Sequence, residues 1–331
     1  MGRRELIALI GGAAAAWPIA GLAQQPERVR RIGVLQGGGG ADDSDGQVRI
    51  AALLQALQQL GWTDGRNIKI DYRWPAGDAE KTRKYAAELV ALAPDVILAV
   101  GAANMTSLFQ ATRTVPIVFV AVADPVGAGY VESLSRPGGN ITGFVNLEAS
   151  VTGKYVELLK EIAPGVARVA IFYNPASAPY HEIYIEPFET AAASLGVVPM
   201  VASVRDLAEL ESVMATQARE PNSGLVSMPS GFESSHYKEI VALAARYRLP
   251  AVYSNLVSAR AGGLLAYSND ISDNFHRAAA YVDRILKGEK PADLPVQFPV
   301  KFDLIINLKT AKALGLEVPL LLQQRADEVI E

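Results

Sequence analysis

The sequence contains no cysteine and only three histidines, and acidic side chains slightly outnumber basic ones. Without cysteine the chain forms no disulfide framework, thiol nucleophile, cysteine-ligated metal or Fe–S site, or lipid-modified cysteine of the bacterial lipoprotein type. The formal net charge of −4 argues against a polyanion partner such as nucleic acid. The histidines, His181, His236 and His276, have no ligand partner at helical spacing, so surface or packing positions are expected for them.

Signatures of nucleotide binding and nucleophilic catalysis are also missing. The four glycines from Gly37 to Gly40 do not form G-x-G-x-x-G, and no Lys-Ser or Lys-Thr follows them as a P-loop requires. Ser230 stands in Met-Pro-Ser-Gly-Phe, which lacks the flanking glycines of a hydrolase nucleophile elbow. We therefore expect a protein that is not an enzyme and that uses no cofactor or metal ion.

The first 23 residues have the pattern of a secretory signal peptide. Arg3 and Arg4 precede an apolar run, and the small residues Gly21 and Ala23 suit cleavage before Gln24. A membrane anchor is the weaker alternative, because the run is short and interrupted for a spanning helix. The paired arginines also resemble a twin-arginine signal, which leaves that route and the general export route open. A soluble exported protein without a lipid anchor is retained between two membranes, so we expect the periplasm.

Length and composition favour two α/β domains. A chain of 331 residues, half of them hydrophobic and a fifth charged, is long enough for two hydrophobic cores. Short apolar runs alternate with amphipathic segments, as in parallel strands covered by helices, and the alternation resumes in the second half of the chain. Strands are predicted at 32–35, 67–74, 95–100, 116–122, 141–147, 168–173, 197–204, 225–228, 251–253, 264–267 and 302–307.

The stretch Pro116–Leu147 joins the two halves. Its first strand ends at Asp124-Pro125, a cluster of turn formers follows at 136–140, and a second short strand leads out of the first unit. An ordinary loop inside one large domain is the alternative that this stretch leaves open. Three prolines within 291–299 separate single elements later in the chain, which favours more than one crossing between the units and hence a hinge.

The candidate ligand-binding residues lie in loops that follow predicted strands. In doubly wound sheets, ligands bind beyond the carboxyl ends of the strands, where helix N-termini also present free N–H groups. These loops are rich in Gly, Ser, Asn and Asp, although helix caps and turns require the same residue types. The candidates are Gln36, Gly101, Asn104, Thr106, Asp124, Asn174, Ser177, Tyr180, Ser230, Phe232, Tyr253, Asn255 and Asp270.

Three segments carry a resemblance to a known family: the leader, the stretch PIVFVAVADPVGAGYVESLSRPGGNITGF from Pro116, and the C-terminal part from GGLLAYSNDISDNFHR at Gly262 to the closing RADEVIE. The sequence resembles ABC-transporter substrate-binding proteins related to the tryptophan/tyrosine-binding branch. This resemblance covers essentially the whole chain after the leader. It implies a type I periplasmic binding protein, with two Rossmann-like, doubly wound parallel-sheet lobes that are joined by three crossings and close on a ligand in the cleft.

The expected domains are a signal peptide at 1–23, lobe 1 at 28–146 plus 270–295, and lobe 2 at 147–269 plus 296–331. The resemblance further implies a monomeric receptor that captures a small amino-acid-like or aromatic acid solute and delivers it to an ABC transporter permease in the inner membrane. Two alternatives stay open. One is a sensory binding protein that reports to a partner receptor, and the other is an exported α/β enzyme.

Such a ligand assigns roles to some of the loop candidates. Asp124 and Asp270 are the candidates for an acid that binds an ammonium group, and helix starts near Asn104 and Ser177 offer N–H groups to a carboxylate. Aromatic candidates supply apolar walls, namely Tyr180, Phe232 and Tyr253. The alternative interpretation is structural: Asp124 caps a turn, and the tyrosines belong to the core.

Overall fold

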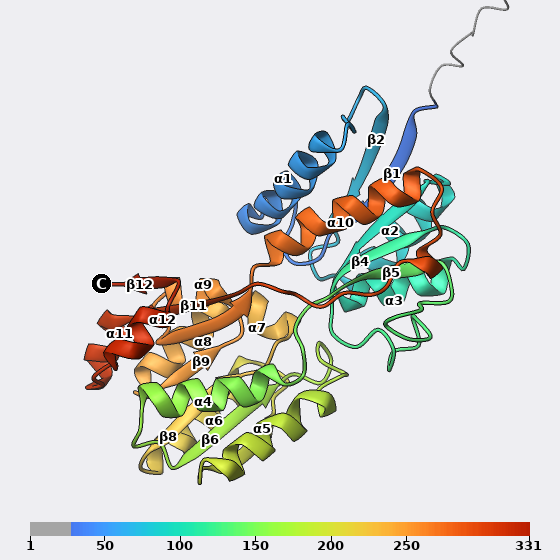
Figure 1. Ribbon diagram of the computed structural model, residues 1–331. Helices are drawn as coiled ribbons and strands as arrows, with labels where there is room; N and C mark the ends of the chain where they lie inside the picture. The colour runs from blue at the N-terminus through green and yellow to red at the C-terminus, as the bar shows by residue number, and fades with distance from the viewer. Residues whose placement is uncertain (1–27) are drawn as a thin grey trace, which may run out of the picture.

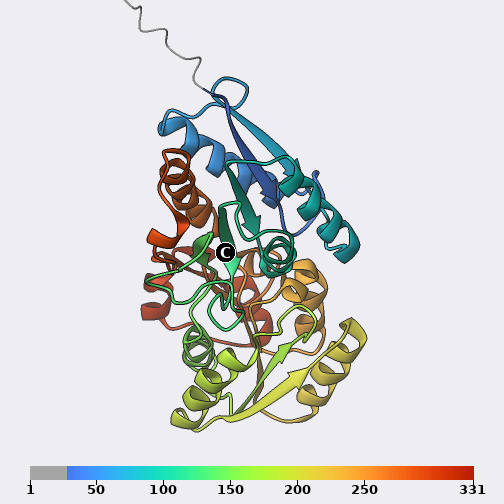
Figure 2. The same ribbon diagram turned by 90° about the vertical axis from the view of Figure 1, so that its right-hand side faces the viewer.

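A computed structural model describes residues 28–331 and contains two β-sheets, each covered by helices (Figure 1). We call the five-stranded sheet with its helices lobe 1 and the seven-stranded sheet with its helices lobe 2. Figure 2 shows lobe 1, blue to teal, above lobe 2, which is yellow-green to yellow. The predicted α/β fold with two parallel-sheet lobes is thus confirmed, whereas the predicted signal peptide lies outside the described residues.

Lobe 1 is an all-parallel sheet with the strand order β2-β1-β3-β4-β5. Its strands are β1 (Arg30–Leu35), β2 (Ile68–Arg73), β3 (Val96–Val100), β4 (Ile117–Val122) and β5 (Ile141–Val145). Its helices are α1 (Ser44–Gln59), α2 (Ala79–Ala91), α3 (Ala102–Ala111) and, from far along the chain, α10 (Ile271–Leu286). Figure 1 shows α1 and α10 side by side, and they share one core with the sheet, while α2 and α3 share the other.

The two cores of lobe 1 explain why its central strands are apolar throughout. In β3, Val96 and Leu98 point to the α1/α10 side, whereas Ile97 and Ala99 point to the α2/α3 side. A parallel sheet that is covered on both faces requires apolar side chains at every position, which is the pattern that the sequence displays.

Lobe 2 has the strand order β12-β11-β10-β9-β8-β6-β7. Its strands are β6 (Arg168–Tyr173), β7 (Val198–Ser203), β8 (Ser223–Ser227), β9 (Ala251–Tyr253), β10 (Leu265–Asn269), β11 (Phe302–Asn307) and β12 (Glu328–Ile330). Its helices are α4 (Val151–Ile162), α5 (Glu182–Ser194), α6 (Leu207–Arg219), α7 (Gly231–Ser235), α8 (Tyr237–Arg246), α9 (Leu256–Arg260), α11 (Leu308–Leu314) and α12 (Leu320–Arg325). All its strand pairs are parallel except β10 with β11, which are antiparallel because β11 is entered from lobe 1 rather than through a covering helix.

The chain crosses between the lobes three times. It leaves lobe 1 after β5, returns from β10 into α10, and leaves again after the short 3-10 helix Pro291–Asp293 to enter β11. The third crossing begins later than residue 296, where the sequence places the boundary. The N–H of Gln297 still donates to Gly143 O at 3.0 Å, and Val145 N–H donates to Gln297 O at 2.8 Å, so this residue pairs with β5.

The first two crossings leave from the carboxyl ends of their strands, β5 and β10. The carboxyl edges of both sheets therefore face the region between the lobes, which is where doubly wound proteins bind ligands. Among residues 28–331 no helix combines the length and the apolar character needed to cross a membrane.

Candidate functional site

Hydrogen bonds hold together two lobe 2 loops that carry predicted site residues. Asn174 Oδ1 accepts from the Ser177 N–H at 3.0 Å, and Ser177 Oγ accepts from the Phe232 N–H at 3.2 Å. The Tyr180 hydroxyl donates to Pro229 O at 3.3 Å. The loops after β6 and β8 thus form one surface. The predicted helix start at Ser177 is wrong, because residues 174–181 form turns and α5 begins at Glu182.

In lobe 1, Asn104 ties the ends of two strands together. Its buried Nδ2 donates to Leu35 O at 3.1 Å and to Val100 O at 2.8 Å, which joins the ends of β1 and β3. Thr106 Oγ1 donates to Ala102 O at 2.9 Å and lies 2.6 Å from the Tyr130 hydroxyl. Backbone carbonyls therefore satisfy the amide nitrogen of Asn104, and the side chain joins the two strand ends.

Helix α3 begins at Ala102, two residues earlier than predicted, and its N-terminus is open. Its N-cap, Gly101, has φ of 86° and no side-chain cap, and an added Cβ would meet nothing within 4 Å. The first N–H groups of a helix lack intrahelical partners and favour an anion. This N-terminus can accept a carboxylate.

The two predicted ammonium-binding acids each have one structural contact. Asp124 Oδ1 accepts from the Gly127 N–H at 2.8 Å, and Asp270 Oδ1 accepts from the Ser272 N–H at 2.8 Å as the N-cap of α10. Ser230 and Asn255 act in the same way as N-caps of α7 and α9. The structural interpretation accounts for one side-chain oxygen in each case, and ligand contact by these residues stays a prediction.

The aromatic candidates differ in where their rings lie. Phe232 is 7 % exposed and Tyr253 is 2 % exposed, and both belong to a hydrophobic core of lobe 2. Tyr180 is half-buried, packs edge-on to Tyr184 with ring centroids 6.0 Å apart, and has its pKa raised to about 12 by burial. Of the three aromatic side chains, only the half-buried Tyr180 is exposed enough to form an apolar wall of a binding site.

Buried polar atoms without a hydrogen-bond partner gather at the carboxyl ends of the strands. Buried polar groups in native proteins are nearly always paired, so such a cluster needs a reason, such as a ligand or ordered water. Within residues 28–331, both amide atoms of Gln36 and Asn269 are unpartnered. The same holds for single oxygens of Asn146, Tyr155, Ser227, Ser254 and Asn274, and outside this cluster only for Gln217 Oε1.

Only Gln36 of this cluster is a predicted candidate. Asn146, Ser254 and Asn269 lie at the ends of strands, and this position could have identified them as site candidates. The sequence alone, however, does not distinguish a buried polar side chain from an exposed turn residue. Asn274 lies in the first turn of α10 and Tyr155 at the start of the second turn of α4, both soon after crossings, and periodicity alone assigns Tyr155 to the helix core.

A buried carboxyl group, Glu233, was also missed. It is 1 % exposed and lies on α7, directly after the loop that follows β8. Ser258 Oγ donates to Glu233 Oε1 at 3.1 Å. Burial raises the pKa of Glu233 to about 8, and no lysine or arginine in the described part of the chain is close enough to lower it.

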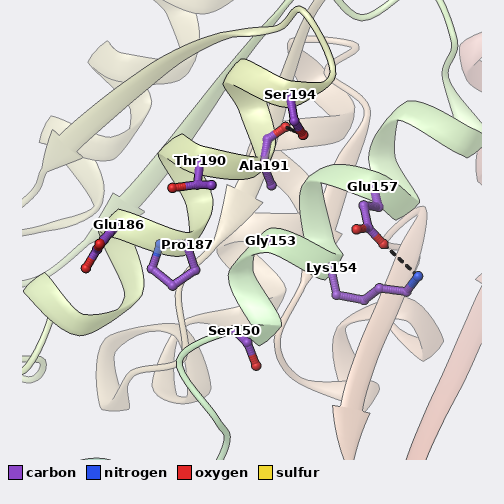
Figure 3. A pocket seen from close by; sticks show the side chains of 9 residues that line it. All are labelled: Ser150, Gly153, Lys154, Glu157, Glu186, Pro187, Thr190, Ala191 and Ser194. Carbon is purple, nitrogen blue, oxygen red and sulfur yellow. Dashed lines mark hydrogen bonds and ion pairs between the residues drawn. The ribbon is translucent and has the colours of Figure 1, made fainter.

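A groove of about 550 Å³ lies elsewhere, between α4 and α5 (Figure 3). Lys154 and Glu157, which form an ion pair at 2.8 Å, lie on its α4 side, and Glu186 and Thr190 lie on its α5 side. None of the predicted candidates lines this groove.

Two α/β lobes with three crossings, and polar loops from both lobes at the facing carboxyl edges, define the two-lobed type I class of periplasmic binding proteins. Within that class, the chain belongs to the ABC transporter substrate binding protein family, whose sequence model matches residues 44–330. The resemblance inferred from the sequence is confirmed.

Relatives of known name support this placement. The chain is 26 % identical over 276 residues to the tyrosine-binding protein of Clostridioides difficile. The aligned region covers 80 % of this chain and 76 % of that protein. A conserved domain protein from Vibrio cholerae has a TM-score of 0.82 at 28 % identity and covers 91 % of this chain and 100 % of its own. An ABC domain from Streptococcus pneumonia in complex with L-Trp has a TM-score of 0.82 at 26 % identity, covering 91 % and 99 %.

Proposed function

We propose that this protein is the solute-binding component of an ABC importer, which captures a small amino-acid-like or aromatic acid solute between its lobes and delivers it to a permease in the inner membrane. It acts as a monomeric, non-enzymatic receptor in the periplasm after removal of residues 1–23. The observation that carries the proposal is the cluster of buried, unpartnered polar atoms at the carboxyl edges of both sheets. Relatives that bind tyrosine and L-Trp support the ligand class.

The open N-terminus of α3 is the proposed contact for the ligand's carboxylate. The free N–H groups and the dipole of this ten-residue helix stabilise a negative group, so no buried cationic side chain is needed to neutralise it. The remaining contacts are proposed among the loop candidates of both lobes, because a ligand drives closure only through contacts that are better in the closed form.

Thermal unfolding against a panel of amino acids and aromatic acids tests this proposal. A ligand at 100 times its Kd adds about 2.7 kcal/mol to the free energy of unfolding, which is readily detected as a raised Tm. We expect aromatic amino acids to stabilise the protein and sugars to leave the Tm unchanged. A panel without any stabilising amino acid or aromatic acid contradicts the proposed ligand class.

A further inference from the structure

Glu233 lies under two of the loops that face the region between the lobes. Its helix, α7, follows the loop after β8, and its hydrogen-bond partner Ser258 belongs to α9, which follows the loop after β9. Ser254, the first residue after β9, is close enough to lower the pKa of Glu233, although its Oγ forms no hydrogen bond in the structure. The carboxyl group is thus held between the starts of two helices at the carboxyl edge of lobe 2.

The carboxyl group of Glu233 does not have the helix-capping role that its local sequence predicts. Ser230-x-x-Glu233 is a capping box, in which the glutamate returns to the N-cap N–H at the protein surface. Ser230 Oγ does accept from the Glu233 N–H at 3.1 Å, but the carboxyl group binds Ser258 inside the lobe. Helix capping therefore does not explain the burial of an acid.

Two hydroxyl groups without a hydrogen-bond partner belong to residues that interact electrostatically with Glu233. The Ser254 Oγ and the Tyr155 hydroxyl are buried and unpartnered. Burial, and to a lesser extent Glu233, raises the pKa of Tyr155 and of Tyr253, so neither tyrosine supplies a charge at neutral pH. An ammonium group has three N–H donors and one positive charge, which matches three oxygen acceptors of which one is an acid.

Building on the proposed function, we propose that Glu233, together with Ser254 and Tyr155, binds the ammonium group of the ligand. Asp124 and Asp270 are less suited, because both are more exposed than Glu233 and each already caps a turn or a helix by accepting from a backbone N–H. A ligand ammonium group replaces the proton of Glu233 and turns an uncompensated buried acid into an ion pair. Ligand binding therefore releases a proton from this site.

Calorimetry of wild-type protein and Glu233→Gln with matched ligands tests the assignment. The ligands are L-tyrosine and L-tryptophan, each beside its analogue with hydrogen in place of the amino group. We expect the substitution to weaken binding of the amino acids about 10- to 100-fold, because one charge-assisted contact is lost. Binding of the analogues is expected to be unchanged, and Glu239→Gln, at an exposed position of α8, serves as the matched control.

Proton release separates recognition from a merely structural role. With a pKa of about 8, most Glu233 side chains carry a proton at pH 7, so titrations in buffers of different ionisation enthalpy should show net release of protons when an amino acid binds. No release is expected with the analogues or in Glu233→Gln. If that variant does not fold, Ser254→Ala is expected to weaken amino acid binding several-fold and to spare the analogues.

Two results overturn the assignment in different ways. Wild-type binding of an amino acid without proton release, and with equal affinity in Glu233→Gln, refutes the role of Glu233 and leaves the proposed function intact. Failure of the wild-type protein to bind any amino acid refutes the proposed ligand class, and the role of Glu233 with it.

Discussion

Replacement of Glu233 by glutamine is expected to stabilise the ligand-free protein at neutral pH. The unfolded chain ionises Glu233 near its ordinary pKa of 4.5, whereas the folded chain keeps the proton up to about pH 8. Between these values the folded state binds the extra proton, so the stability of the wild-type protein falls as the pH rises. The fall is about 1.4 kcal/mol per pH unit, which amounts to about 3 kcal/mol at pH 7.

Glutamine has the shape of the neutral acid and can still accept from Ser258, but it does not ionise. The free energy of unfolding of Glu233→Gln should therefore lack this component of the pH dependence. The difference between variant and wild type should grow by about 3 kcal/mol from pH 5 to pH 7.5. Other titrating groups contribute equally to both proteins and cancel in the difference.

Urea unfolding followed by far-UV circular dichroism measures the effect. Circular dichroism is the appropriate signal, because the tryptophans of the described chain, Trp62 and Trp74, belong to lobe 1 and Glu233 belongs to lobe 2. The exposed Glu239→Gln is the control and should follow the wild-type pH profile. Parallel pH profiles for wild type and Glu233→Gln would refute the reasoning, since they would mean that Glu233 ionises alike in the folded and unfolded chain.

Three further predictions concern the glycine in β5, the lobes and the leader. Gly143→Ala should cost more than about 2 kcal/mol in stability, because at its φ of 154° an added Cβ would collide with the backbone oxygen of Phe119 in β4. Gly139→Ala, whose Cβ would meet nothing within 4 Å, should be nearly neutral in urea unfolding. Small-angle scattering should show a smaller radius of gyration when ligand saturates the protein, and an unchanged radius would contradict rotation of lobe 1 against lobe 2. The intact mass of the exported protein should lack residues 1–23, and a full-length protein held in the inner membrane would contradict cleavage.

Most of the fold was predictable because parallel strands leave a strong pattern. Central strands such as β3 and β4 are apolar at every position. Helices such as α2 begin at an aspartate N-cap, Asp78, which can be recognised in the sequence. Short elements escaped prediction: α9, α12 and β12 have three to six residues each, too few to develop a period. Tertiary contacts position them instead: α9 packs against β10 and β11, and β12 pairs with β11.

The site was predictable only at the level of loops. Gln36 was identified because it follows an apolar strand, and it proves to be fully buried. Glu233 was not, because its local sequence specifies an exposed capping glutamate, and its burial depends on α9, a helix more than twenty residues away that has no periodic signal. Which side chains end up buried without a partner is a property of tertiary packing rather than of local sequence.

The insertion of α10 into lobe 1 has a consequence for the order of folding during synthesis. The core beneath α1 includes Phe275 and Val282 of α10, so it stays open until the ribosome has passed residue 286. Lobe 2 in turn gains its last strand, β12, only at Glu328–Ile330. Neither lobe can mature while the chain is half made, and contacts of such long sequence separation form slowly. In a nascent chain built in this way lobe 1 stays incomplete, and open to chaperones, until residue 286 has been made, and lobe 2 until residue 330 has been made.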